Sequence, residues 1–211
     1  GVISSTTPTA PIGTSAPMGL PDKVEAISTN SDIIVASLFD KSQKNITASN
    51  KGYDASPVYT FDGKYILYRS QATAAFEADR WRIMRYNRQT GETVELTRGF
   101  DQQVDELVPS SDSKTVYFTA GLRGHSPIFS VPVEPDLRLK IATPVKQIAD
   151  VGAIGGLNIS PDGRTFVFSL SATQAPADIF RMNTDGSGER QLRTVTASPA
   201  EIAADDWVTQ R

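Results

Sequence analysis

The chain has 211 residues, of which 39% are hydrophobic and 21% charged, and its net charge is -3. This composition is typical of a folded globular protein, and the scattered Lys and Arg residues form no basic stripe for nucleic acid. The sequence has no cysteine and one histidine, His125, which excludes disulfides, a cysteine nucleophile and a multi-histidine metal centre. No apolar run approaches the length of a membrane span. We therefore expect no nucleic acid, membrane, metal or cofactor as a partner.

The first part of the chain differs in composition from the rest. Residues 1–22 are rich in Ser, Thr, Pro and Gly and lack the apolar alternation of a strand. We predict a linker or an irregular leading segment there. From residue 32 the chain reads DIIVASLFDKSQKNIT, in which two short apolar runs flank a polar turn. That pattern predicts a hairpin.

Three later segments share one pattern, an apolar stretch, an Asp-containing turn and an alternating apolar run. They are SPVYTFDGKYILYRS (56–70), LVPSSDSKTVYFTA (107–120) and LNISPDGRTFVFSL (157–170). Their turn aspartates, Asp62, Asp112 and Asp162, lie 50 residues apart. Each segment predicts a tight antiparallel hairpin. Ser113 replaces the glycine of the other two turns, so its turn should be strained or of another type.

A second hairpin pattern follows each of these segments, and the stretch from residue 32 matches it. The first and last apolar residues of this unit are 13 apart in three copies, Ile33 to Ile46, Ile83 to Leu96 and Ile179 to Leu192. In the remaining copy, Ile128 to Ile148, the spacing is 20 because EPDLRLKIATP is inserted. Two hairpins per period give four strands in a repeat of roughly 40 to 50 residues, the period of a β-propeller blade.

We therefore predict an all-β fold, an incomplete β-propeller of four-stranded antiparallel blades over residues 23–211. The predicted blades are half of one at 31–48 and complete ones at 54–98, 104–149 and 155–194. A β-sandwich with accidental spacing is the alternative. About three and a half to four blades are fewer than most closed propellers have. We expect a fragment, or a ring completed by something else, and uncovered sheet faces would favour a homo-oligomer.

Nothing in the sequence indicates a catalytic triad within the chain. A Gly-x-Ser-x-Gly nucleophile elbow is missing, and the sequence identifies no orienting partner for His125. We interpret His125 as an exposed loop residue. The aspartates form no calcium-binding loop pattern. We predict that this chain is not catalytic by itself.

The segment FEADRW at residues 76–81 lies in an enlarged loop. From turn aspartate to the next hairpin the chain takes 21 residues in this repeat, Asp62 to Ile83, but 16 and 17 in the other two. Such a loop joins the second and third strands of a blade and rises from the same rim as the connections between blades. Loops on a rigid sheet scaffold often carry binding residues.

This loop is our candidate substrate-binding site. If the segment is extended, Glu77 and Asp79 share a side and could hold an ammonium group between two carboxylates. Arg80 would bind a carbonyl group or clamp the two acids, and Trp81 with Phe76 would supply apolar walls or pin the loop to the blade. The alternative is a solvated loop whose acids pair with nearby arginines and whose rings pack on the blade edge.

One linked string resembles the N-terminal propeller of the prolyl oligopeptidase family, in its dipeptidyl-peptidase V and acylaminoacyl-peptidase branch. The string runs from Gly52-Tyr53-Asp54 through Tyr68-Arg69-Ser70 to Glu77-Ala78-Asp79-Arg80-Trp81, and the resemblance covers about residues 23 to 195. TolB-like propellers share the Asp-Gly turns alone. In this family the propeller caps a C-terminal α/β-hydrolase domain that carries Ser, Asp and His.

The resemblance implies the non-catalytic propeller portion of a serine peptidase of dipeptidyl or acylaminoacyl type. We expect it to be secreted or periplasmic, with a cytoplasmic location as the alternative. It implies short peptides and a hydrolase domain as partners, with the propeller gating and orienting the peptides. The paired Glu-Glu of dipeptidyl-peptidase IV is absent, and Glu77 with Asp79 would take its place at the substrate's free amino terminus. A free-standing TolB-like scaffold and a propeller enzyme with its own rim chemistry are the alternatives.

Overall fold

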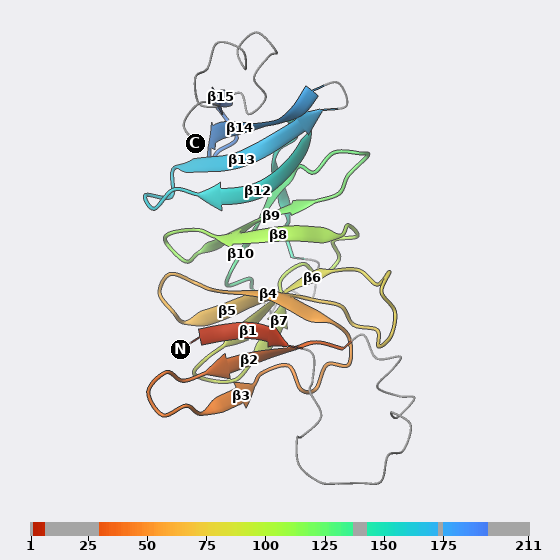
Figure 1. Cartoon of the computed structure of the whole chain (residues 1–211), viewed down its shortest axis with the longest axis vertical. Coiled ribbons are helices and arrows are strands. Elements are labelled where there is room, and N and C mark those ends of the chain that lie inside the picture. The colour runs from red at the N-terminus through yellow and green to blue at the C-terminus, as the bar shows by residue number, and fades with distance from the viewer. Residues whose placement is uncertain (1, 7–29, 137–142, 173–174, 194–211) are drawn as a thin grey trace, which may run out of the picture.

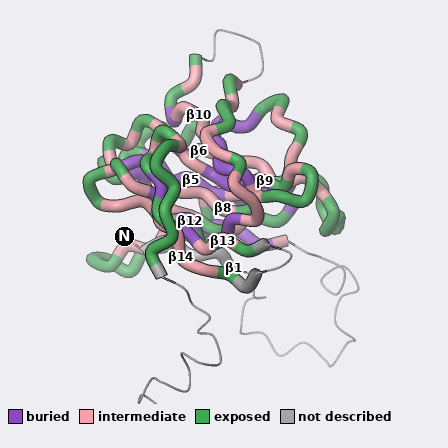
Figure 2. Tube along the Cα trace, turned by 90° about the horizontal axis from the view of Figure 1, so that it is seen from above, coloured by how far each residue is buried: buried purple, intermediate pink, exposed green. Residues whose placement is uncertain are grey.

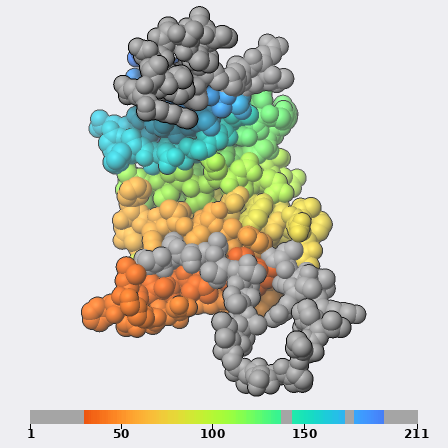
Figure 3. Space-filling model, in the orientation of Figure 1, coloured from red at the N-terminus to blue at the C-terminus, as the bar shows by residue number. Residues whose placement is uncertain are grey.

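The chain forms a stack of antiparallel β-sheets (Figure 1). The computed structural model describes residues 2–6, 30–136, 143–172 and 175–193. Within these ranges every regular element is a strand, and the strands form four sheets, one of three strands and three of four. Figure 3 shows the sheets as successive coloured layers in chain order. The predicted all-β fold of incomplete propeller blades is confirmed.

In each four-stranded sheet consecutive strands pair antiparallel. The second sheet contains β4 (Asp54–Tyr59), β5 (Tyr65–Ser70), β6 (Arg82–Asn87) and β7 (Thr93–Glu95). The third contains β8 (Val104–Pro109), β9 (Thr115–Ala120), β10 (Ile128–Pro132) and β11 (Lys146–Ala149). The fourth contains β12 (Ala153–Ile159), β13 (Thr165–Ala172), β14 (Ala175–Asn183) and β15 (Arg190–Arg193).

The first sheet has the order β1-β2-β3 and begins with a strand that the sequence did not indicate. Its strands are β1 (Val2–Thr6), β2 (Asp32–Ala36) and β3 (Gln43–Asn45). The prediction of an irregular leading segment is wrong for residues 2–6, which pair with β2 from Val2↔Ala36 to Thr6↔Asp32. The edge of β2 that faces away from β3 needs backbone partners, and β1 supplies them. Residues 7–22 of that segment lie outside the described residues.

The Asp-containing turns have the same hydrogen bonds in all three repeats. Two residues before each aspartate a hydroxyl donates to its carboxylate at 2.6 Å, from Thr60, Ser110 and Ser160. The pKa of each aspartate lies below its ordinary value, and this hydrogen bond is the main cause. Ser113 adopts the left-handed conformation, φ 61°, that glycine adopts in the other two turns. Of the two predicted outcomes, a strained turn or another turn type, the structure shows the strained turn. The Ser113 hydroxyl also accepts a hydrogen bond from the backbone N–H of Asp62 in the neighbouring sheet, at 2.9 Å.

Buried side chains from facing sheets meet in three clusters. The cluster between the first and second sheets includes Ile33, Ile66, Tyr68 and Tyr86. The cluster between the second and third sheets includes Leu67, Ile83, Leu96, Phe118 and Phe129. The cluster between the third and fourth sheets includes Ile128, Leu157, Phe166 and Phe168. Figure 2 shows buried segments inside the stack and exposed segments in the turns around it.

Candidate functional site

The FEADRW loop lies on the rim that carries the connections between sheets. It joins β5 to β6, and Figure 1 shows it at the edge opposite the Asp-containing turns. The Arg80 side chain donates to the carbonyl oxygen of Phe100, and the Trp81 backbone N–H donates to Oε1 of Gln103 at 3.0 Å. Phe100 and Gln103 belong to the connection between β7 and β8. The loop is therefore fixed to the neighbouring sheet connection.

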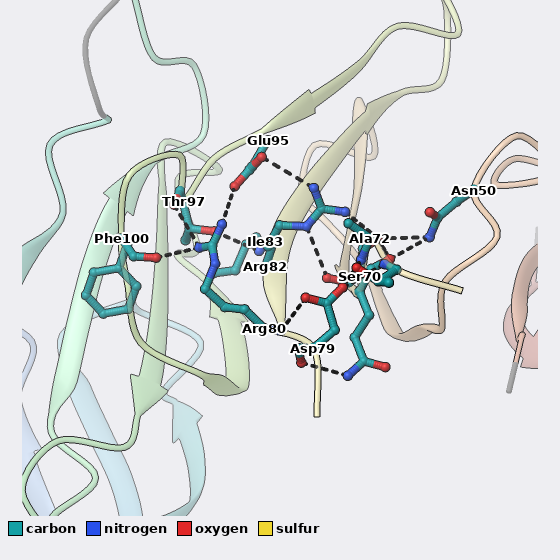
Figure 4. A network of polar contacts seen from close by, with 12 residues as sticks. Asn50, Ser70, Ala72, Asp79, Arg80, Arg82, Ile83, Glu95, Thr97 and Phe100 are labelled. Atoms are coloured by element: carbon teal, nitrogen blue, oxygen red, sulfur yellow. Dashed lines mark hydrogen bonds and ion pairs between the residues drawn. The ribbon is translucent and has the colours of Figure 1, made fainter. Parts of the chain in front are cut away.

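The carboxylate of Asp79 is occupied by backbone donors (Figure 4). Its Oδ2 accepts bonds from the N–H groups of Ala72 and Thr73, both at 2.7 Å, and its Oδ1 accepts one from Arg80 at 2.8 Å. Burial raises the pKa of Asp79, but these backbone bonds outweigh burial, and the pKa lies below its ordinary value. Asp79 therefore closes the loop on itself as an anion.

Glu95 binds the two arginines that flank Trp81. The carboxylate lies 3.2 Å from Nη2 of Arg80 and 3.5 Å from Nη1 of Arg82, as Figure 4 shows. The side chain of Glu95 is only 17% exposed. The sequence predicted that acids of the loop could pair with arginines, but the acid comes from β7. Because Arg80 also donates to the Phe100 carbonyl, its guanidinium holds the loop in place.

Trp81 packs against the body of the propeller. Its ring lies 5.5 Å from the ring of Tyr53 in an edge-on arrangement, and the guanidinium of Arg69 lies 4.7 Å from its centroid. Its carbonyl accepts a bond from the N–H of Val104 at 3.3 Å. Trp81 therefore holds the loop against the blade, which is one of the two roles that the sequence suggested for Trp81 and Phe76. The other ring, Phe76, is exposed.

Glu77 has a fixed backbone and an unoccupied side chain. Nε2 of Gln71 donates to the carbonyl oxygens of Glu77 and Asp79, at 3.0 and 2.8 Å. The Glu77 side chain is exposed and makes no hydrogen bond or ion pair with any residue that the structure describes. Of the two acids predicted to act as a pair, Asp79 is engaged with the backbone and Glu77 is available to a ligand.

A buried acid lies beside the start of this loop. Both carboxylate oxygens of Asp54 accept bonds from Nδ2 of Asn50, at 3.0 and 3.1 Å, and the same nitrogen donates to the carbonyl of Gln71 at 2.9 Å. Asp54 is fully buried. Burial raises the pKa of Asp54 and outweighs the bonds from Ser70 and Asn50 that lower it.

We expect the pH dependence of stability to differ between the wild type and Asp54→Asn. A raised pKa means that the folded state takes up the Asp54 proton before the unfolded state does. The stability that results is present at acid pH and is lost as the pH rises through the folded pKa. From pH 7 to about pH 4, the wild type should therefore gain free energy of unfolding relative to Asp54→Asn. Urea unfolding at both pH values measures this difference, and a constant difference would contradict the prediction.

His125 has an orienting partner that the sequence did not identify. Its Nδ1 lies 2.7 Å from Oδ1 of Asp150, and its side chain is 54% exposed. The interpretation as an exposed residue is right, and the absence of a partner is wrong, because the tight β9–β10 turn brings His125 to the β11–β12 connection.

Among the described residues no group of three potential metal ligands occurs. In the same residues no helix is long and apolar enough to cross a membrane.

Known proteins resemble this chain in sequence and in fold. The dipeptidyl-peptidase 5 proteins of Porphyromonas gingivalis and Porphyromonas endodontalis are 27% and 32% identical to it over 158 residues, which cover 75% of this chain and 22% of each relative. The TolB structure from Agrobacterium tumefaciens has a TM-score of 0.59 at 20% identity and matches 78% of this chain and 57% of that one. No protein-family model matches the chain.

The sheets and turns define the chain as a partial β-propeller of the TolB-like class. Its sequence relatives indicate a propeller of the peptidase family, because the chain is similar to part of the dipeptidyl-peptidase 5 proteins. The family resemblance that the sequence indicated is confirmed. The chain spans about a fifth of the length of the curated relatives that it matches.

Proposed function

We propose that the chain is the non-catalytic propeller portion of a secreted or periplasmic serine peptidase of dipeptidyl or acylaminoacyl type. In this role it gates and orients short peptides for an α/β-hydrolase domain of the same protein. The sequence similarity to dipeptidyl-peptidase 5 along three quarters of the chain carries the proposal.

The geometry of the rim supports a recognition role for the FEADRW loop. Glu77 presents a free carboxylate on a backbone that Gln71 holds in place. Asp79, Arg80 and Trp81 are the positioning residues, since their polar groups and rings are engaged within the propeller. A preformed loop loses little conformational entropy when a ligand binds. In the proposed enzyme, Glu77 accepts hydrogen bonds from the ammonium group at the amino terminus of a peptide.

Replacing Glu77 with Gln in the full-length protein should lower kcat/KM for dipeptidyl substrates with a free amino group. A charge-assisted hydrogen bond contributes about 1.5 to 3 kcal/mol, which corresponds to a loss of about tenfold to hundredfold. The same substrates with an acetylated amino group should be cleaved at an unchanged rate. Steady-state kinetics on both substrate series measures this selectivity.

Glu189→Gln is the matched control, because Glu189 is also exposed and makes no hydrogen bond or ion pair with a described residue. Equal losses on free and acetylated substrates would assign a structural role to Glu77. Residues 1–211 alone should turn over neither substrate. A natural gene product without a hydrolase domain would overturn the proposed function and would favour a binding or scaffold propeller.

A further inference from the structure

A second feature of the same rim is a cleft beside His125. The cleft has a volume of about 500 Å³ and lies between the β9–β10 turn, the β11–β12 connection and β13. Its lining residues include His125, Val151, Ala153, Leu170 and Ser171. We call it the His125 cleft. Figure 1 shows the β9–β10 turn on the same edge of the stack as the FEADRW loop, one sheet further along.

The polar end of the cleft is held rigidly. Leu122 and His125 exchange two backbone hydrogen bonds, at 2.9 and 3.0 Å, around the two-residue tip Arg123-Gly124. Both tip residues have positive φ, 53° and 84°. A left-handed arginine costs on the order of 1 kcal/mol, and such strain often occurs at functional sites. The backbone N–H of Ser126 donates to Gly152 O at 3.0 Å and fixes the turn to the next connection.

At the polar end of the His125 cleft, two groups have no hydrogen-bond partner among the described residues. Because Nδ1 of His125 faces Asp150, the other ring nitrogen, Nε2, is left for a ligand, and it bonds to no residue that the structure describes. The N–H of Gly124 is also unpaired in this part of the chain, and a Cβ atom added at Gly124 would meet nothing within 4 Å. When His125 is protonated, it donates from both nitrogens, and its charge is balanced by Asp150. Because protonated His125 and Asp150 cancel each other, the exposed guanidinium of Arg123 then gives the turn a net positive charge.

The other end of the cleft is apolar. Leu170 and Val151 pack against the hydrophobic cluster between the third and fourth sheets, and they line the cleft together with Ala153. Ser171 also lines the cleft, on the strand that pairs with β12 at Ala153↔Ser171, and its hydroxyl donates to the carbonyl oxygen of Ala153 at 3.5 Å. Donors and positive charge at one end and aliphatic walls at the other favour a ligand with an anionic group next to an apolar one.

We propose that the His125 cleft binds a carboxylate attached to an apolar group, the chemistry of the carboxyl-terminal residue of a short peptide. Protonated His125, through its Nε2–H, and the Gly124 N–H bind the carboxylate, Arg123 attracts it, and Leu170 and Val151 contact the apolar side chain. Asp150 is a positioning residue that orients the imidazole. This inference stands on the geometry of the cleft and does not depend on the role of Glu77.

Titration of the full chain with N-acetyl-leucine and with its neutral amide tests the site. The acid should bind at least about tenfold more tightly than the amide, as expected for a hydrogen bond to a charged group. His125→Ala should remove this preference, and Arg123→Ala should weaken binding of the acid. Arg190→Ala is the control, because it removes an equal charge from an exposed position on β15 and should change nothing.

Asp150→Asn gives an independent check, since the asparagine can still accept a bond from the ring. It should reduce binding of the acid by a smaller factor than His125→Ala and should leave binding of the amide unchanged. Acetyl-Ala-Ala-Leu and 4-methylpentanoate distinguish a peptide terminus from a simple organic acid. Equal affinities for acid and amide, or equal effects of the His125 and Arg190 variants, would overturn the proposal. Circular dichroism melting of each variant confirms that it is folded.

Discussion

Replacing Phe118 with alanine is expected to lower the free energy of unfolding by about 3 to 5 kcal/mol. Phe118 is fully buried between the second and third sheets. Its ring stacks on Phe129 with centroids 5.6 Å apart and meets Phe100 edge-on at 5.5 Å. Because the alanine variant leaves a cavity where three rings meet, both the transfer of the ring out of water and its packing are lost.

The same substitution should loosen the FEADRW loop. Phe100 packs on Phe118, and its carbonyl accepts the hydrogen bond from Arg80. Urea unfolding measures the loss of stability, and hydrogen exchange over residues 71–81 measures the loosening. Phe39→Ala is the matched control, because the side chain of Phe39 is 99% exposed and its removal should change stability by less than about 0.5 kcal/mol. Similar losses in the two variants would show that Phe118 does not hold the sheets together.

The repeating hairpins could be predicted because their signals are local. In each repeat the turn aspartate and the hydroxyl two residues before it bond to each other, so a short stretch of sequence contains the whole turn. The spacing of 13 residues likewise reflects direct pairing, since the N–H of Leu96 donates to the carbonyl of Ile83 at 2.8 Å. Strand β1 could not be predicted, because its partner β2 lies more than 20 residues away and no short turn connects them.

The position of the candidate loop could be predicted, but the partners of its side chains could not. Counting residues between hairpins placed the loop on the rim. In an antiparallel sheet, successive connections alternate between the two ends of the strands. The spacing does not reveal that the Asp79 carboxylate turns back to Ala72 and Thr73. The register of β6 and β7, Met84↔Glu95, is the signal that could have placed Glu95 near Arg82. No strand register could have placed Asp150 near His125, since Asp150 lies in the β11–β12 connection and His125 in the β9–β10 turn.

Replacing Gly52 with alanine should disturb the start of the FEADRW loop directly. A Cβ atom on Gly52 would lie 2.2 Å from the carbonyl oxygen and 2.7 Å from the carbonyl carbon of Gln71. These are backbone atoms, so no side-chain rotation can relieve the contact. Overpacking of this kind costs about 1 to 3 kcal/mol. We expect a loss of stability in that range, measured by urea unfolding.

The displacement should reach the loop itself, because residues 71 and 72 hold it. Gln71 donates to two of its carbonyls, and the N–H of Ala72 donates to Asp79. The fluorescence of Trp81, which packs on Tyr53 beside Gly52, should therefore shift in Gly52→Ala. Gly121→Ala is the matched control, since a Cβ atom there would meet nothing within 4 Å. If Gly52→Ala destabilised the protein without changing the fluorescence of Trp81, Gly52 would affect the packing of the sheets but not the FEADRW loop. If both signals change, the close approach of the chain at Gly52 is what positions Glu77 on the rim.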